Sequence, residues 1–312
     1  MESKAAPRPP TGEIIRPTTF VDAPRLSRRL GVELTIASET FQHTGSFKFR
    51  AAYQVASRVT QTRIITASSG NFGQALARAC QLLGKSCLVV MPVTSSATKV
   101  EAVREYGGEV EMIDTTRISR AARLRELAAL HPDAYIASPY DDALVIEGNS
   151  SLGAELARSG RAFDCIVAPL GGGGLTSGIV EGLRANGSAT PVYAAEPALA
   201  NDGARSLRSG HLVTNDGEPL TIADGARTAS LGQRNWAILR EGLAGIVEVS
   251  EEQIRESVRL LFGLANLKVE PTGGLGIGAL LAEPGLFSGK AVCCVVSGGN
   301  VDAGVYCGIV GE

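Results

Sequence analysis

Long apolar runs, an excess of charge of one sign and metal-ligand spacings of cysteine are all missing from this 312-residue chain. No stretch approaches the roughly 18 apolar residues that cross a membrane, so we expect no membrane partner. A net charge of −2 gives no reason to expect nucleic acid as a partner. Residues 1–18 contain no continuous apolar segment, which predicts no signal peptide and therefore a cytoplasmic protein. In that compartment we expect the six cysteines to be reduced and mostly buried.

Lysine is also scarce, because the chain has only six lysines and takes the rest of its basic charge from arginine. One of them, Lys48, stands between Phe47 and Phe49, three residues after Gly45. An amine between aromatic rings is partly desolvated, which lowers its pKa and frees its lone pair for imine chemistry. The same pattern also fits the start of an amphipathic helix with a lysine reaching toward solvent. This segment alone does not decide between the two interpretations.

Short apolar runs alternate with amphipathic stretches along most of the chain. Five runs are typical of strands covered on both faces of a parallel sheet, namely Arg63–Ala67, Ser86–Met91, Cys165–Leu170, Val192–Ala195 and Ala291–Val296. The stretches between or after them predict helices over residues 72–83, 97–106, 117–130, 150–159 and 251–267. This alternation predicts an α/β fold.

Two predicted strands are followed by small residues that open a helix. The first such segment is Ser68–Gln74, whose backbone N–H groups could bind a carboxylate or phosphate, although it also fits an ordinary helix cap. The second contains four consecutive glycines, Gly171–Gly174, each costing about 0.5–1 kcal/mol relative to alanine. Neither a Walker loop nor a dinucleotide motif is present, so a phosphate monoester bound by glycine N–H groups is the better interpretation.

A third strand end carries Ser297, in the segment Ser297–Asp302 after the last apolar run. A serine at the carboxyl end of a parallel strand faces the crevice where such sheets bind ligands. Together with Lys48 and the glycine segment, it indicates an aldehyde cofactor with a phosphate group and a ring. Pyridoxal 5′-phosphate meets that description.

Six segments, in their order along the chain, resemble the motifs of the fold type II pyridoxal-phosphate enzymes, most closely serine racemase and the serine/threonine dehydratases. They are Thr44–Arg50, Ser68–Gln74, Gly171–Gly174, Thr221–Gly225, Glu270–Thr272 and Ser297–Asp302. The resemblance runs from about residue 12 to the C-terminus. It implies a tryptophan synthase β-like fold with two parallel-sheet α/β domains and the active site in the cleft between them. The large domain would comprise residues 1–62 and 141–312, the small mobile domain 63–140, and the protein would be a homodimer.

The resemblance also implies roles for individual residues. Lys48 would bind the cofactor covalently and act as catalytic base, and Ser69 would be the acid/base on the opposite face of the substrate. The residues implied around the cofactor are Phe47, Asn71, Gly171, Gly172, Gly173, Gly174 and Ser297. Those implied around the substrate are Ser68, Ser69, Gly70, Asn71 and Thr228. A Mg²⁺ or Ca²⁺ ion would be bound by Glu196, Asp202 and the Ala200 carbonyl, because hard cations prefer oxygen ligands; the alternative there is a solvated acidic loop.

The activity implied is removal of water and ammonia from a β-hydroxy amino acid such as L-serine, L-threonine or 3-hydroxyaspartate, with racemisation as an open addition. Departures from the family pattern cluster on the substrate side. Phe72 stands where histidine is usual, and Glu147–Ser151 is closer to threonine synthases. A β- or γ-replacement enzyme, like threonine synthase or cysteine synthase, is therefore the alternative. A binding protein with a degenerate site is the third hypothesis, which the intact Lys48 disfavours.

Overall fold

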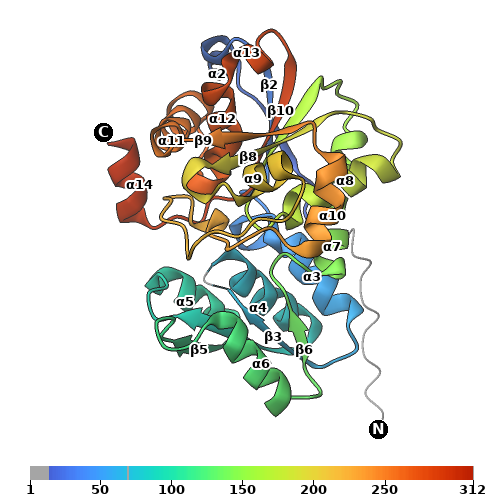
Figure 1. The fold of residues 1–312 in the computed structure, drawn as a ribbon, viewed down its shortest axis with the longest axis vertical. Coiled ribbons are helices and arrows are strands. Elements are labelled where there is room, and N and C mark those ends of the chain that lie inside the picture. The colour runs from blue at the N-terminus through green and yellow to red at the C-terminus, as the bar shows by residue number, and fades with distance from the viewer. Residues whose placement is uncertain (1–13, 69, 312) are drawn as a thin grey trace.

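A computed structural model describes residues 14–68 and 70–311, and its strands form two separate sheets (Figure 1). The six-stranded sheet has the order β1-β2-β10-β7-β8-β9, in which only the β1–β2 pair is antiparallel. Its strands are Thr19–Asp22, Glu33–Ser38, Ala291–Val296, Cys165–Pro169, Val192–Pro197 and Gly245–Val249, in that spatial order. The four-stranded sheet, β5-β4-β3-β6, is wholly parallel. Its strands are Glu109–Ile113, Ser86–Pro92, Arg63–Ala67 and Tyr135–Ala137.

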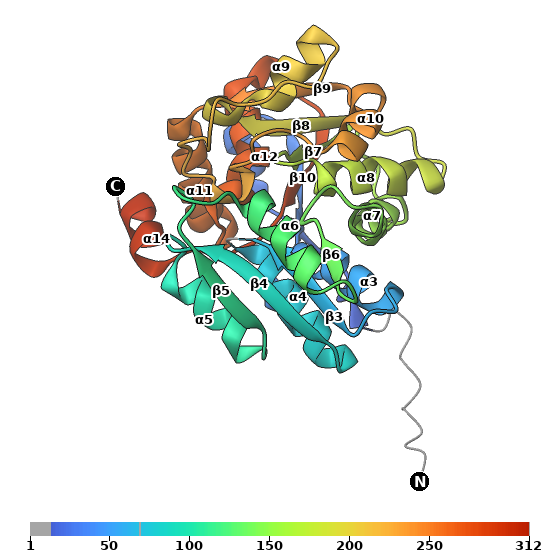
Figure 2. The same cartoon turned by 60° about the horizontal axis from the view of Figure 1, so that its bottom comes forward.

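Helices cover both faces of each sheet, as continuous apolar strands require. On the four-stranded sheet, Ile64 packs into the core shared with α3, α4 and α5, whereas Ile65 faces α6 on the other side (Figure 2). On the six-stranded sheet, Val167 packs toward α11 and α12, and Ile166 packs toward α7 and α8. The helices are α2 Pro24–Leu30, α3 Lys48–Arg58, α4 Asn71–Leu83, α5 Ala97–Glu105, α6 Arg120–Leu130, α7 Ala143–Ala157, α8 Gly174–Ala185, α9 Asp202–Ser209, α10 Gln233–Gly242, α11 Glu251–Ala265, α12 Pro271–Ala282, α13 Pro284–Phe287 and α14 Ala303–Val310. Three short 3₁₀ turns are η1 His43–Gly45, η2 Ala198–Ala200 and η3 Asp224–Ala226.

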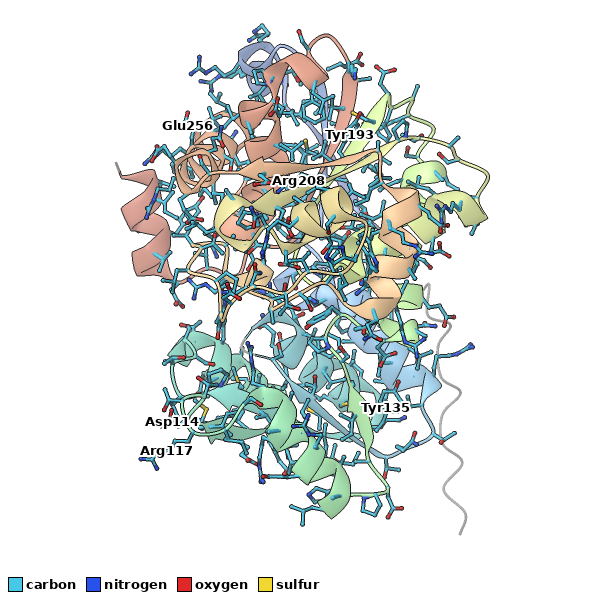
Figure 3. The ribbon with its side chains drawn as sticks, viewed as in Figure 1. Asp114, Arg117, Tyr135, Tyr193, Arg208 and Glu256 are labelled. Atoms are coloured by element: carbon cyan, nitrogen blue, oxygen red, sulfur yellow. The ribbon has the colours of Figure 1, made fainter. Side chains whose placement is uncertain are left out.

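Helix α7 begins at Ala143, seven residues before the predicted start at 150. Asp142 is the N-cap of this helix, because its carboxylate accepts a hydrogen bond from the Leu144 N–H at 2.8 Å. The predicted helix starts after Gly148, but this glycine lies inside the helix and permits close packing on α3. A Cβ atom there would lie 2.7 Å from the Arg50 carbonyl oxygen. Asp142 also accepts a hydrogen bond from the Tyr135 hydroxyl at 2.9 Å, which ties this helix to β6 (Figure 3 labels Tyr135).

The four strands of the smaller sheet all lie within residues 63–140, and those of the larger sheet all lie outside them. Helix α3 precedes residue 63, yet Phe49, Tyr53 and Val55 belong to the hydrophobic core of the smaller sheet. The predicted limits of the two domains therefore stay a prediction. No helix within residues 14–68 and 70–311 has the length and hydropathy to cross a membrane. The six cysteines are all free, and only Cys307 is exposed.

Candidate active site

A cavity of about 560 Å³ lies where the carboxyl ends of β3, β7 and β10 meet. Strand ends of parallel sheets are the usual place for ligands in such folds. Ser69 lies outside the described residues. The other residues predicted for the cofactor or substrate all line the cavity, namely Phe47, Lys48, Ser68, Gly70, Asn71, Gly171, Gly172, Gly173, Gly174, Thr228 and Ser297.

Hydrogen bonds between two distant segments bring Lys48 and Ser297 to the same wall of this cavity. The Phe47 N–H donates to the Ser297 carbonyl at 2.9 Å, and the Gly299 N–H donates to the Gly45 carbonyl at 3.0 Å. The turn before Lys48 is tight, because Thr44 has a φ of 59° and its carbonyl accepts from the Asn300 amide at 2.7 Å. A non-glycine residue with positive φ marks a strained turn that its surroundings must hold in place.

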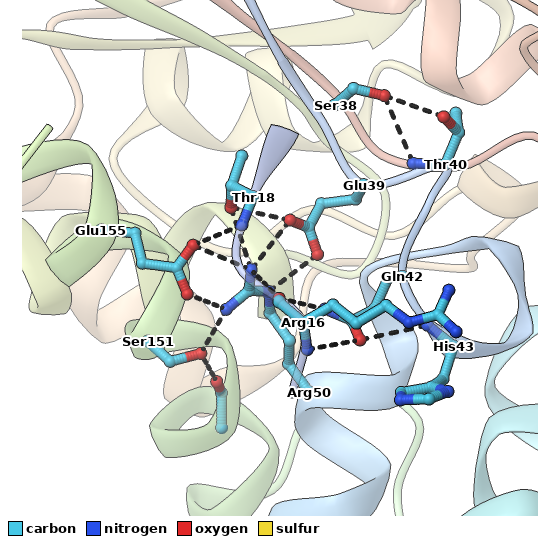
Figure 4. A network of polar contacts seen from close by, with 11 residues as sticks. Arg16, Thr18, Ser38, Glu39, Thr40, Gln42, His43, Arg50, Ser151 and Glu155 are labelled. Atoms are coloured by element: carbon cyan, nitrogen blue, oxygen red, sulfur yellow. Dashed lines mark hydrogen bonds and ion pairs between the residues drawn. The ribbon is translucent and has the colours of Figure 1, made fainter. Parts of the chain in front are cut away.

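Arg50 anchors the first turn of α3 two residues beyond Lys48 (Figure 4). Its fully buried guanidinium donates to Glu39 at 2.7 Å, to Glu155 at 2.7 Å and to the Thr18 hydroxyl at 2.9 Å. These partners come from three other segments of the chain. Breaking a buried pair of this kind costs about 3–5 kcal/mol, so the network fixes the direction in which the helix presents Lys48.

The Lys48 amine lies between two aromatic rings, as the sequence predicts, but the second ring is that of Phe72 and not that of Phe49. Its Nζ atom is 5.0 Å from the centroid of the Phe47 ring and 5.7 Å from that of Phe72. It donates to the Pro139 carbonyl at 2.7 Å. Burial lowers the pKa of Lys48 to about 8, although the Glu270 carboxylate opposes this shift. A large fraction of the amine is therefore neutral at mildly alkaline pH and able to attack a carbonyl group.

Gly172 and Gly173 occupy places where a side chain does not fit, and a Cβ atom on Gly171 or Gly174 would lie 3.0 Å from its nearest neighbour. A Cβ atom on Gly172 would lie 2.4 Å from the ring of Tyr140. Gly173 has a φ of 95°, and a Cβ there would lie 2.8 Å from Asn235. Asn235 holds this loop, since its amide donates to the Gly172 carbonyl at 2.7 Å and to the Tyr140 carbonyl at 3.0 Å. Because α8 begins at Gly174, the loop presents the N-terminus of a helix to the cavity, which favours an anion.

Two buried hydroxyls at the cavity have no hydrogen-bond partner among the described residues. They are the Oγ atom of Ser297 and the Oγ1 atom of Thr228. Leaving a buried polar group unpaired costs about 1–3 kcal/mol. Unpaired hydroxyl groups that line a cavity indicate a ligand that forms hydrogen bonds with them.

The structure adds five charged residues to the site that sequence reasoning did not assign to it, namely Lys99, Arg120, Asp224, Arg227 and Glu270. Arg120 begins α6 and lies 3.7 Å from Glu218. Glu270 is buried and accepts two contacts from the Asn71 amide, at 2.8 and 3.1 Å. Burial raises the pKa of Glu270 to about 7, and the charge of Asp224 adds to the rise. Asp224 and Glu270 belong to motifs noted in the sequence, whereas nothing local distinguishes Lys99 or Arg120.

The residues predicted to bind a metal lie outside the cavity, at the end of β8 and the start of α9. Glu196 and Asp202 are each only 1% exposed, which contradicts the alternative of a solvated loop. Glu196 accepts from the N–H groups of Gly203 and Ala204 at 2.9 and 2.8 Å. Burial raises the pKa of Glu196 well above its ordinary value, and Asp202 adds to the rise. In residues 14–68 and 70–311, no group of three or more acidic, histidine or cysteine side chains could hold a metal ion.

Comparisons with known proteins agree with this geometry. A family model described as "Pyridoxal-phosphate dependent enzyme" matches residues 12–298. The chain belongs to this family. It is 38% identical to an L-threo-3-hydroxyaspartate ammonia-lyase of a Pseudomonas species, over 91% of this chain and 90% of the relative. It is 33% identical to a serine racemase of Schizosaccharomyces pombe, over 93% and 90%. A solved structure of a T.th. threonine deaminase has a TM-score of 0.87 at 38% identity, covering 93% of this chain and 95% of that one.

Family membership confirms the predicted fold class and the predicted cofactor class. The cavity also fits pyridoxal phosphate on its own evidence. It contains a lysine with a lowered pKa, a glycine loop at a helix N-terminus and unpaired hydroxyls at Ser297 and Thr228. A pyridoxal-phosphate enzyme requires an amine, an anion site and a polar group beside the ring, and this chain supplies all three.

Proposed function

We propose that this protein is a pyridoxal-phosphate-dependent ammonia-lyase that acts on β-hydroxy amino acids with a second carboxylate, such as 3-hydroxyaspartate. The observation that carries the proposal is Arg120, whose side chain lines the same cavity as Lys48. An arginine in a cavity for small molecules favours a carboxylate, which it can bind through two N–H groups. The Pseudomonas relative named for hydroxyaspartate supports the same substrate class.

The residues that would hold the cofactor follow from the cavity. We assign the phosphate to Gly171–Gly174, the ring nitrogen to Ser297, the ring hydroxyl to Asn71 and one ring face to Phe47, with Lys48 as the covalent partner. When bound, pyridoxal phosphate supplies an aldehyde for amino groups and a ring that makes the substrate Cα–H more acidic. Support for these assignments comes from the glycine geometry and from the unpaired Ser297 hydroxyl.

The chain's own residues carry the remaining steps. The neutral Lys48 amine accepts the Cα proton, as its pKa of about 8 allows. The Ser68 hydroxyl and the backbone N–H groups of Gly70 and Asn71, at the start of α4, hold the α-carboxylate. The uncharged Ser297 hydroxyl would stabilise a positive charge on the ring nitrogen of bound pyridoxal phosphate less than a carboxylate would. The ring would then draw less negative charge from the substrate Cα, which favours prompt loss of the β-hydroxyl group. The substrate thus loses one proton and one hydroxide as water, and hydrolysis of the resulting enamine yields a 2-keto acid and ammonia.

The segment on which the alternative of a replacement enzyme rests does not reach the cavity. The segment Glu147–Ser151 lies inside α7, and it does not line the cavity. Its Asn149 amide donates to the Gly174 carbonyl at 3.0 Å and so supports the glycine loop on the side away from the cavity. The proposed lyase should release keto acid and ammonia in equal amounts with no added nucleophile, whereas a replacement enzyme requires a second substrate.

Replacing Arg120 by glutamine tests the substrate class. We expect kcat/KM for 3-hydroxyaspartate to fall about 100-fold, because a charge-assisted hydrogen bond contributes about 1.5–3 kcal/mol. For L-serine, which lacks the second carboxylate, the change should stay within about threefold. Both values come from assays of ammonia release. Arg117→Gln is the matched control, since Arg117 is 86% exposed and does not line the cavity. Equal losses for both substrates would contradict the role of Arg120.

We also propose that Glu196, Asp202 and the Ala200 carbonyl bind one Mg²⁺ or Ca²⁺ ion. The support is the burial of two carboxylates six positions apart, whose repulsion a divalent cation would relieve. Binding a ligand at about 100 times its Kd stabilises a protein by about 2.7 kcal/mol, so a chelator should lower Tm by about 5 °C. Calorimetry with and without added ion measures this shift. The double variant Glu196→Gln with Asp202→Asn should lose the response, and an unchanged Tm in the unmodified protein would contradict the site.

A further inference from the structure

Arg227 lines the cavity but has no role in the proposed function. It directly follows the turn η3, which is attached to the side of the larger sheet because the Gly225 N–H donates to the Thr272 hydroxyl at 3.0 Å. The Nε–H group of Arg227 donates to the carbonyl of Thr221 at 2.7 Å. Thr221 is only 1% exposed, so this hydrogen bond fixes one edge of the guanidinium against a buried residue. The two Nη groups at the other end are left for a ligand.

The charge of Arg227 is not neutralised by the protein. Within the part of the chain that the structure describes, its Nη groups form neither a hydrogen bond nor an ion pair. Two other cations at the cavity do have carboxylate partners, because Lys99 is paired with Asp224 and Arg120 lies 3.7 Å from Glu218. Arginine binds carboxylates through two parallel hydrogen bonds, and a guanidinium with one fixed edge is prepared to form them.

The residue after Arg227 offers a hydroxyl group to the same cavity. The Oγ1 atom of Thr228 is buried and has no partner among the described residues. Its backbone is held in place, since its N–H donates to the Ala226 carbonyl at 2.9 Å and its carbonyl accepts from the Asn215 amide at 3.2 Å. In 3-hydroxyaspartate the β-carbon carries both a hydroxyl group and the second carboxylate. Thr228 and Arg227 are neighbours that can bind these two groups.

We propose that Arg227 is a specificity-determining residue that binds the second carboxylate while Thr228 binds the β-hydroxyl group, so that the protein selects one diastereomer of its substrate. The inference rests on the proposed function for the substrate class. Arg120 approaches the same carboxylate from α6, on the side of the smaller sheet. A carboxylate has enough lone pairs to accept hydrogen bonds from both guanidinium groups.

Fixing the carboxylate also fixes rotation about the bond between Cα and Cβ. The hydroxyl group leaves rapidly only when its bond to Cβ lies parallel to the Cα–H bond that breaks, because the electrons released at Cα must overlap with it. With the carboxylate bound to Arg227, the hydroxyl group of one diastereomer takes this orientation beside Thr228. In the other diastereomer a hydrogen atom takes that place, and elimination is slow. L-Serine has no carboxylate on Cβ, so Arg227 does not affect its orientation.

The variant Arg227→Gln tests this role in the holoenzyme. We expect kcat/KM for the preferred diastereomer, threo or erythro, of 3-hydroxyaspartate to fall about 30-fold, as for loss of a charge-assisted hydrogen bond. The preference over the other diastereomer should fall about tenfold, and the value for L-serine should stay within about threefold. Ammonia release measures all three substrates. Arg234→Gln is the matched control, because it removes a positive charge from an exposed residue of α10 that does not line the cavity.

Succinate, a dicarboxylate without an amino or hydroxyl group, measures the same site without turnover. Titration calorimetry of the holoenzyme should give a Kd about tenfold higher in Arg227→Gln and unchanged in Arg234→Gln. An equal loss for L-serine, an unchanged preference between diastereomers or an unchanged Kd for succinate overturns the proposal. Weaker binding of pyridoxal phosphate to Arg227→Gln also overturns it, because Arg227 would then bind the cofactor's phosphate.

Failure of the proposed function has a different result. The unmodified protein would then release no ammonia from 3-hydroxyaspartate, or Arg120→Gln would affect both substrates equally. The affinity for succinate still decides whether Arg227 binds a carboxylate, because that measurement needs no reaction. A selective loss in Arg120→Gln without one in Arg227→Gln would leave the proposed function in place and overturn only the role of Arg227.

Discussion

Replacing Lys48 by alanine should lower the rate of ammonia release by about 10⁴-fold or more. The variant loses both the covalent link to the cofactor and the base for the Cα proton, and acid–base catalysis alone contributes about 10²- to 10⁴-fold. The fold should survive, because the α3 helix is anchored by the buried Arg50 network rather than by Lys48. A discontinuous assay for ammonia and 2-keto acid measures the loss.

Lys290→Ala is the control for this experiment, because Lys290 does not line the cavity. It should keep full activity. The pKa of Lys48 allows a second measurement. Pyridoxal phosphate is first removed from the protein, and the rate at which the protein takes it up again is then measured as a function of pH. Below the pKa of about 8 the ammonium form dominates, so the rate of uptake should fall about tenfold for each pH unit. A Lys48→Ala variant with more than a tenth of the normal activity would contradict the assigned role.

Replacing Ser69 by alanine should lower any racemisation by about 10²- to 10⁴-fold, while elimination from the L-substrate remains measurable. The family resemblance assigns Ser69 to the substrate face opposite Lys48, where a hydroxyl exchanges a proton with Cα. Ser69 is outside the described residues, but its neighbours Ser68 and Gly70 both line the cavity. Chiral chromatography of serine left after partial turnover, together with ammonia release, measures both activities.

Ser150→Ala serves as the control, since the Ser150 hydroxyl donates to the Glu147 carbonyl within α7 and lies away from the cavity. Both activities should be unchanged in this variant. If Ser69→Ala loses elimination from the L-substrate and reaction of the D-substrate to the same extent, Ser69 binds the carboxylate and is not the proton donor. Racemisation at the normal rate in Ser69→Ala would show that a group other than Ser69 donates the proton.

Strands β3, β4, β7, β8 and β10 could be predicted from sequence because both their faces are apolar, whereas β1, β2, β5, β6 and β9 were missed. Strands such as β7 and β10 therefore appear as continuous apolar runs. The edge strand β5 was missed, because its sequence Glu-Val-Glu-Met-Ile is half exposed and resembles a loop or helix. The start of α7 was missed because glycine is a poor helix former, although the missing side chain of Gly148 serves packing against α3.

The candidate site could be predicted as far as its residues follow strand ends, because the carboxyl ends of parallel strands converge in space. This explains why Ser68, Gly171 and Ser297 reach one cavity. Arg120 and Lys99 could not be predicted, since they lie within ordinary amphipathic helices and reach the cavity only through the packing of the two sheets. The homodimer, the cytoplasmic location and the absence of a nucleic-acid partner stay predictions.

The most direct test of the account is to locate the lysine that binds the cofactor. Borohydride treatment of the holoenzyme converts an imine into a stable secondary amine, and peptide mass spectrometry then identifies the modified residue. The account predicts one label per chain, on Lys48. A label on Lys99 or Lys268, or a protein that takes up no pyridoxal phosphate at all, would contradict it.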